Sequence, residues 1–144
     1  MPIEFKVTVN KDLFQKLKKA SGGQIEKEIP VWLDGVGTEL LNEVQNEIMK
    51  RKVVDTRKLL QSFAKDGDSN IWRMDDEKLG FTLKVGSSLH YARYVNYGHW
   101  TTSKGVSQRW VDARPYWTSA LRHFGPKFRE HVNARFRQWI RQYL

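Results

Sequence analysis

The four histidines of this 144-residue chain are the side chains most suited to acid–base or metal chemistry. They are His90, His99, His123 and His131. No pair of them has the HxxxH spacing of a helical metal site, and none has a clear carboxylate ligand beside it. A zinc site needs three or four convergent ligands. We therefore expect surface or helix-cap roles for the histidines and predict neither a metal nor a cofactor.

The acidic run Asp75-Asp76-Glu77 could bind a divalent cation in principle, but adjacent acids in a hairpin turn are usually solvated. The chain contains none of the GxSxG, GxxxxGK or GxGxxG motifs that mark nucleophile elbows and phosphate-binding loops. No paired general acid and base is recognisable. The sequence therefore predicts a protein that is not an enzyme, and a small toxin-like enzyme is the least favoured of three hypotheses.

Aromatic and basic residues crowd both sides of a polar stretch, Thr101 to Gln108. Exposed rings beside cations can stack on nucleic-acid bases. Tyr and Trp are also common in cores and subunit contacts, and we favour that interpretation. The candidate contact residues in and around this stretch are Tyr91, Arg93, Tyr94, Tyr97, His99, Trp100, Lys104, Arg109 and Trp110.

The net charge of +9 is concentrated in the second half of the chain. Residues 1–86 carry 15 basic and 14 acidic side chains, whereas residues 87–144 carry 10 and 2. A basic half of this kind indicates an acidic partner, either nucleic acid or an acidic protein surface. The alternative is a solvated basic face with no partner. Arg122, Arg129, Arg137 and Arg141 fall roughly on one side of the last predicted helix. They could meet phosphates, a neighbour's carboxylates or the stripe Glu39, Glu43 and Glu47, or remain exposed.

Composition favours one folded domain over residues 1–144. Apolar residues make up 40% of the chain, which is enough for a core at this length. The absence of cysteine excludes disulfides and thiolate metal sites. The N-terminus lacks a signal-like pattern, and no apolar run approaches the roughly 18 residues of a membrane span.

The first half of the chain predicts a strand and two helices. Alternating apolar residues predict a strand over Ile3–Val9. A short helix begins at Asn10 or Asp12 and ends at Ser21-Gly22-Gly23. Apolar residues at intervals of three or four predict a long helix from about Gln24 to Lys52. Because Pro30 is best tolerated in a first turn, that helix could instead begin nearer Ile29.

The second half predicts a hairpin between shorter helices. A helix is expected over Arg57–Lys65, and strands over Ile71–Met74 and Leu79–Val85 form an antiparallel hairpin. His90–Tyr97 forms one or two helical turns, and Arg109–Val111 is a short strand. Pro115 opens a final helix that reaches the C-terminus, with a kink or short break at Gly125-Pro126.

Together these elements predict an α+β fold. We expect an antiparallel sheet of about four strands, including Arg109–Val111, with the long helix and the C-terminal helix covering one face. The loop from Trp100 to Gln108 has few apolar side chains to offset the entropy of ordering it. It is therefore expected to be mobile in the isolated subunit and to become ordered on assembly, where Lys104 can reach an acidic partner.

Three blocks of residues, in order, carry a family resemblance. They are Thr56-Arg57-Lys58-Leu59-Leu60-Gln61-Ser62-Phe63; Val85-Gly86 with Tyr91-Ala92-Arg93-Tyr94-Val95-Asn96-Tyr97-Gly98; and Ala113-Arg114-Pro115-Tyr116-Trp117 with Ala120-Leu121. This pattern resembles the head–tail joining, or tail-completion, proteins of long-tailed bacteriophages (the gp-ten-like family). Arg57, Asn96 and His99 depart from the Gly, Glu and Thr that the family often has.

The resemblance implies a structural virion protein of the phage neck, assembled in the host cytoplasm. Such proteins form a ring, commonly a hexamer, that completes the tail tube and docks on the head connector. It implies subunit or partner contacts for the aromatic and basic residues above and for Arg114, Arg122 and Arg129, and DNA could pass through the lumen. The alternative hypothesis is a basic nucleic-acid-binding module.

Overall fold

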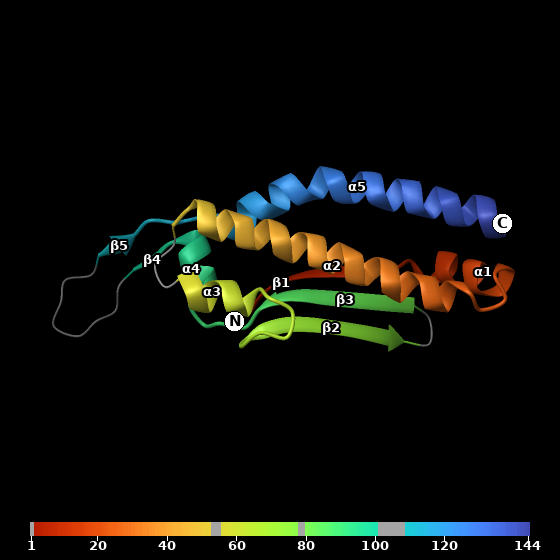
Figure 1. Ribbon diagram of the computed structural model, residues 1–144, viewed down its shortest axis with the longest axis horizontal. Coiled ribbons are helices and arrows are strands. Elements are labelled where there is room, and N and C mark those ends of the chain that lie inside the picture. The colour runs from red at the N-terminus through yellow and green to blue at the C-terminus, as the bar shows by residue number, and fades with distance from the viewer. Residues whose placement is uncertain (1, 53–55, 78–79, 101–108) are drawn as a thin grey trace.

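The computed structural model describes residues 2–52, 56–77, 80–100 and 109–144. Its elements, in chain order, are β1 (Ile3–Thr8), α1 (Lys11–Ala20), α2 (Ile25–Lys50), α3 (Thr56–Ser62), β2 (Asn70–Glu77), β3 (Gly80–Ser87), α4 (Ala92–Tyr97), β4 (His99–Trp100), β5 (Trp110–Val111) and α5 (Tyr116–Tyr143). The predicted α+β class is confirmed (Figure 1).

The main sheet has three antiparallel strands in the order β1-β3-β2. Ile3 lies opposite Ser87 in the β1–β3 pair, and Glu77 lies opposite Gly80 in the hairpin of β2 and β3. The predicted sheet that joins the N-terminal strand to the hairpin is therefore confirmed. Gly86 is required where β1 crosses closest, because a Cβ there would lie 2.0 Å from the Ile3 carbonyl oxygen.

The prediction that Arg109–Val111 joins this sheet is wrong. β5 pairs instead with β4, in a separate two-stranded sheet where Trp100 lies opposite Trp110. Gly98, with φ of 79°, turns the chain sharply at the end of α4. The segment that follows leaves the body as an arm, so β5 lies beyond reach of the main sheet (Figure 1). The predicted mobile loop falls on residues 101–108, outside the described part.

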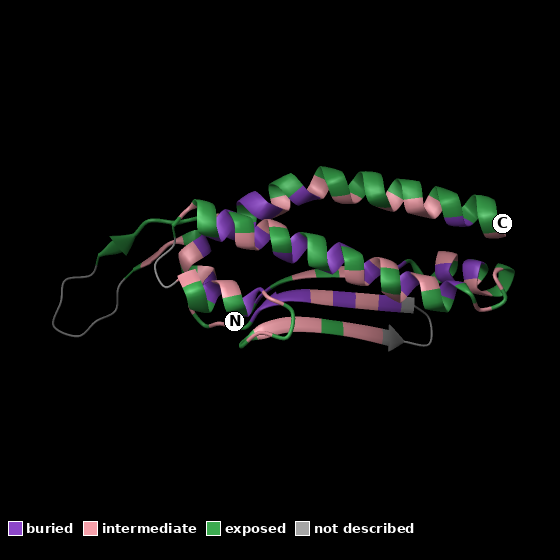
Figure 2. Cartoon of the chain, viewed as in Figure 1, coloured by how far each residue is buried: buried purple, intermediate pink, exposed green. Residues whose placement is uncertain are grey.

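Both long helices cover the same face of the main sheet. The outer methyl of Leu83 and the ring of Trp72 lie within 3.0 Å of where a Cβ on Gly37 of α2 would be, so only glycine fits there. Phe5 of β1 meets Phe124 of α5 edge to face, with ring centres 5.9 Å apart. Figure 2 shows the buried stripes of α2 and β3 facing each other.

Prolines inside both long helices leave them continuous. α2 begins at Ile25, so the earlier of the two predicted starts is confirmed, and Pro30 lies within the helix. α5 runs without a break through Pro126 and is bowed along its length, as Figure 1 shows. α3 ends at Ser62, three residues before the predicted Lys65. Within the described ranges, no helix combines the length and apolarity needed to span a membrane.

Candidate assembly surface

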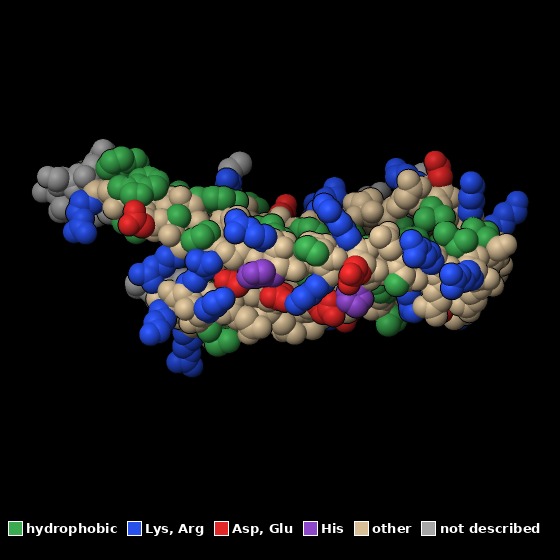
Figure 3. All heavy atoms as spheres, turned by 90° about the horizontal axis from the view of Figure 1, so that it is seen from above, with side chains coloured by type: hydrophobic (Ala, Val, Ile, Leu, Met, Phe, Trp, Pro, Cys, Tyr) green, Lys and Arg blue, Asp and Glu red, His purple; other side chains and the backbone are tan. Residues whose placement is uncertain are grey.

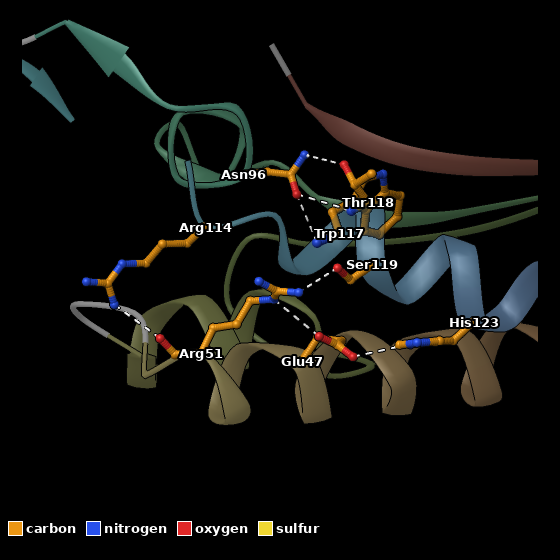
Figure 4. Close-up of polar contacts among 8 residues, drawn as sticks. All are labelled: Glu47, Arg51, Asn96, Arg114, Trp117, Thr118, Ser119 and His123. Carbon is orange, nitrogen blue, oxygen red and sulfur yellow. Dashed lines mark hydrogen bonds and ion pairs between the residues drawn. The ribbon is translucent and has the colours of Figure 1, made fainter. Parts of the chain in front are cut away.

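Asn96 connects α4 to the start of α5. Its side chain is buried, and its Oδ1 accepts hydrogen bonds from the backbone N–H groups of Trp117 (3.0 Å) and Thr118 (3.1 Å). Its Nδ2 donates to Thr118 Oγ1 at 3.1 Å. The first N–H groups of a helix have no partner within the helix. Asn96 therefore caps α5 from a distant part of the chain and fixes α4 against it (Figure 4).

Arg114 and Tyr116 hold the same junction from the other side. The guanidinium of Arg114 donates to the carbonyl oxygens of Arg51 (3.1 Å) and Lys52 (2.7 Å), where α2 ends. A cation at a helix C-terminus satisfies free carbonyls and suits the helix dipole. The buried hydroxyl of Tyr116 donates to the Ala92 carbonyl at 2.7 Å, and burial raises the pKa of Tyr116 well above its usual range. The ends of α2, α4 and α5 are thus tied together.

A polar ladder runs along the contact between α2 and α5. Glu47, although buried, binds Arg51 Nε at 3.2 Å and His123 Nδ1 at 3.3 Å. Arg51 also donates to Ser119 Oγ at 2.6 Å, as Figure 4 shows. Farther along, Glu43 binds Lys127 at 2.9 Å, and the hydrogen bond to Glu43 raises the pKa of Lys127.

The acidic stripe of α2 therefore does meet the last helix within one chain, but not through arginine. Glu39 approaches His131 at 3.9 Å, so two histidines and a lysine supply the partners. The predicted arginine stripe, Arg122, Arg129, Arg137 and Arg141, is exposed and makes no ion pair with any described residue. Those arginines remain available to another molecule.

Four exposed rings and one exposed valine gather on α4 and the arm, and we call this set the aromatic surface. Its members and their exposed fractions are Tyr94 (54%), Tyr97 (55%), Trp100 (58%), Trp110 (48%) and Val111 (40%). Figure 3 shows apolar side chains clustered at the arm end of the molecule with basic ones nearby. Contiguous exposed apolar groups of this kind mark contact sites for proteins or other ligands.

The aromatic surface is partly ordered by its own contacts. The rings of Trp100 and Trp110 meet edge to face at 5.5 Å across the β4–β5 pair. The rings of Tyr94 and His99 lie 5.5 Å apart. A hollow of about 440 Å³ opens beside α4, lined by His90, Arg93, Tyr94, Tyr97 and Gly98. An aromatic or apolar side chain of a partner fits such a hollow, and the Arg93 guanidinium, 6.0 Å from the Tyr97 ring, adds positive charge.

The structure brings together most of the predicted contact residues. Arg93, Tyr94, Tyr97 and His99 cluster on α4 and the base of the arm, with Trp100 and Trp110 following along it. Tyr91 is half-buried at the N-terminal end of α4, and Arg109 is exposed beside β5. Arg122 and Arg129 lie apart, on α5, and Lys104 lies outside the described residues. The contacts described for Arg114 are within the chain, so its partner contact stays a prediction.

Two features of this surface have no signal in the sequence. Asn96 attracted attention only as a departure from a family pattern, although one buried amide capping a distant helix organises the site. No local signal reveals a cap formed across 21 residues. For Val111 the sequence predicts only a place in a strand, and its exposure depends on β5 lying outside the main sheet. Among the described residues, no three His, Asp or Glu side chains are grouped to hold a metal ion.

The small α+β scaffold carries an exposed aromatic arm and a basic outer helix, features of a protein that contacts other macromolecules. Residues 11–98 match the family described as "Bacteriophage HK97-gp10, putative tail-component", and the chain belongs to this family. Membership places it among the structural proteins of phage tails, as the blocks of residues had predicted.

Two proteins of Bacillus subtilis (strain 168) are similar over nearly their whole length. The phage-like element PBSX protein XkdI is 29% identical over 161 residues, covering 95% of this chain and 99% of XkdI. The uncharacterized protein YqbI is 33% identical over 155 residues, covering 88% of this chain and 92% of YqbI. No solved structure matches the chain.

Proposed function

We propose that this protein forms a ring at the head-proximal end of a phage tail, where it completes the tail tube and joins it to the head connector. Six copies form the ring, and the finished ring is part of the virion after assembly in the host cytoplasm. Its partners are further copies of itself, the tail tube protein and the connector, and DNA passes through the lumen. No catalytic step is involved.

The aromatic surface is the observation that supports this function best. Its two tryptophans and Val111 project from the body on an arm, whereas its base on α4 is fixed by the Asn96 cap and by the Arg114 bonds to α2. Buried Trp and Tyr anchors supply much of the binding energy in protein interfaces. An arm that carries such anchors away from a rigid frame suits docking to another structural protein.

The experiment replaces the two arm tryptophans together, Trp100→Ser with Trp110→Ser, in a phage or prophage that encodes the protein. Both rings are about half exposed, so the fold should survive while partner contact is lost. Electron microscopy of lysates should then show filled heads and free tails that are not attached. The matched control is Val31→Ser, which alters an apolar side chain on α2 that is 72% exposed and lies away from the arm. A normal yield of joined particles from the double variant contradicts the proposal.

Binding of the purified protein to DNA tests the alternative function. A nucleic-acid-binding module with several phosphate contacts would bind tightly and lose affinity steeply with salt. We expect weak binding at physiological salt, since the aromatic surface is built for a protein partner. Tight, salt-sensitive DNA binding that needs Arg93 and Tyr97 would favour the nucleic-acid-binding module instead.

A further inference from the structure

We propose that neighbouring copies join edge to edge, with β1 of one copy pairing in parallel with β2 of the next, so that the ring carries one continuous sheet. This inference rests on the ring of the proposed function and names the surfaces that build it. It starts from the sheet order β1-β3-β2, which leaves both β1 and β2 as edges. An open edge is a template for another strand.

The hydrogen-bond pattern identifies the free backbone groups on β1. Val9 N–H donates to the Phe81 carbonyl at 3.0 Å, and residues of an antiparallel pair alternate between bonded and non-bonded positions. Odd-numbered residues of β1 therefore bond to β3. Glu4, Lys6 and Thr8 point their N–H and C=O groups away from β3, and no backbone partner for them occurs in the described part of the chain.

The same reasoning identifies the free groups on β2. The odd-numbered residues of β3 form backbone hydrogen bonds to β1, so its even-numbered residues form them to β2. Those even-numbered residues lie opposite Arg73 and Asp75. Trp72 and Met74 therefore turn their backbone groups toward the open edge. Both edges run antiparallel to β3 and so share one direction. A rotation that brings β1 of one copy against β2 of the next makes a parallel ladder. Repeated head-to-tail contacts of this kind form a ring when the rotation between copies closes.

Side-chain charge selects one register for this pairing. On the face of the sheet away from the helices, β1 presents Glu4 and then Lys6, while β2 presents Arg73 and then Asp75. In parallel alignment Glu4 lies beside Arg73 of the next copy and Lys6 beside Asp75, so opposite charges meet at both positions. This register also obeys the backbone alternation, in which an outward-bonding residue lies opposite an inward-bonding one. Arg73 and Asp75 bind each other at 3.1 Å within one copy and can exchange partners at the exposed edge.

An apolar groove beside β1 supplies space for the incoming strand. It measures about 400 Å³ and is lined by one side of β1 and by α5, with Phe5, Val7, Trp32, Phe128, Val132 and Phe136 in its walls. Phe128, Val132 and Phe136 are only half-buried, so a strand added beside β1 can cover them further. In the chosen register, Met74 of the next copy lies beside Phe5, where its side chain enters this groove. The added strand thus gains side-chain burial as well as backbone hydrogen bonds.

Cross-linking between two cysteine variants tests the pairing. The chain has no cysteine, so a short bismaleimide reacts only where one is introduced. Copies with Lys6→Cys mixed with copies with Asp75→Cys should give a cross-linked dimer, whereas either variant alone should not. In the matched control, copies with Lys6→Cys are mixed with copies with Lys84→Cys. Residue 84 lies on the same face but in the central strand, so this mixture should give no cross-linked dimer. A chain with both Lys6→Cys and Asp75→Cys should give a ladder that ends at the ring number.

Proline variants test the backbone ladder independently. Lys6→Pro and Met74→Pro each remove an N–H that faces only the open edge, where a strand tolerates proline. Each should raise the concentration needed for assembly by about tenfold or more, as loss of a backbone bond requires. Mixed in equal amounts they share one intact β1–β2 contact, so sedimentation should show one-to-one dimers and nothing larger.

The outcomes separate the inference from the function. An oligomer without the 6-to-75 cross-link, or one that both proline variants still form normally, leaves the ring in place and overturns edge pairing. A wild-type chain that forms no oligomer and is missing from the necks of particles removes the proposed function itself. Cross-linking in the predicted pattern, with dimers from the proline mixture, supports both.

Discussion

Replacing Asn96 with alanine should destabilise the protein strongly, because one buried amide satisfies two N–H groups at the start of α5. Loss of a helix N-cap costs about 1 kcal/mol. The N–H of the buried Trp117 is left without a partner, which adds about 1–3 kcal/mol. We therefore expect Asn96→Ala to lower the free energy of unfolding by about 2–4 kcal/mol, or the Tm by about 6–12 °C at this chain length.

Thermal unfolding followed by circular dichroism measures this loss. Asn96→Asp is the informative companion, since its carboxylate can accept both N–H groups and suits the positive end of the helix. It should stay within about 1 kcal/mol of wild type. Asn133→Ala, on the exposed side of α5, controls for removing an asparagine from a helical region. A loss below about 0.5 kcal/mol for Asn96→Ala would show that the cap contributes little, contrary to the magnitudes above.

Two further predictions concern packing and pH. Gly37→Ala should destabilise the fold by about 1–3 kcal/mol through overpacking, because the new Cβ would lie 2.6 Å from the Trp72 ring. Gly35→Ala should instead stabilise α2 by up to about 1 kcal/mol, because no atom lies within 4 Å of the new Cβ. Urea unfolding of the two variants checks this, and equal effects would contradict the close contact. The pKa of Tyr116 is raised by burial, so its stabilising contribution is present below the unfolded pKa of about 10 and is lost as pH rises above it. Tyr116→Phe loses the bond to Ala92, at a cost of about 1 kcal/mol, and its Tm should fall less than that of wild type between pH 9 and 11; parallel Tm curves would contradict this assignment.

The spacing of apolar residues predicted the long helix and the longer strands correctly. One face of the strand is apolar between Ile3 and Val9, and one face of the long helix is apolar between Ile25 and Ile48. These two faces form much of the core. Pairing of the N-terminal strand with the hairpin followed from the same patterns. Short elements are harder, because Arg109–Val111 has too few residues to show which sheet it joins. Its partner is decided by Gly98, which turns the chain away from the body.

The sequence predicted which residue types form the contact surface but not how the folded chain arranges them. Clustering of Tyr, Trp and Arg between Tyr91 and Trp110 marked a contact surface, and the exposed rings agree with that interpretation. The sequence could not show that Arg114 caps α2 or that His123 serves Glu47, since both depend on how α5 crosses α2. The groove beside β1 likewise depends on how α5 lies beside β1 in the folded chain.

Locating the protein in intact particles shows whether it lies where the tail meets the head. A hexahistidine tag added after Leu144, whose side chain is 62% exposed, can be labelled with gold and viewed by electron microscopy. We expect label at the junction of head and tail in joined particles, and at the head-proximal end of free tails. Label at the distal tip, label spread along the whole tube, or none on particles that contain the tagged protein would contradict the proposed function.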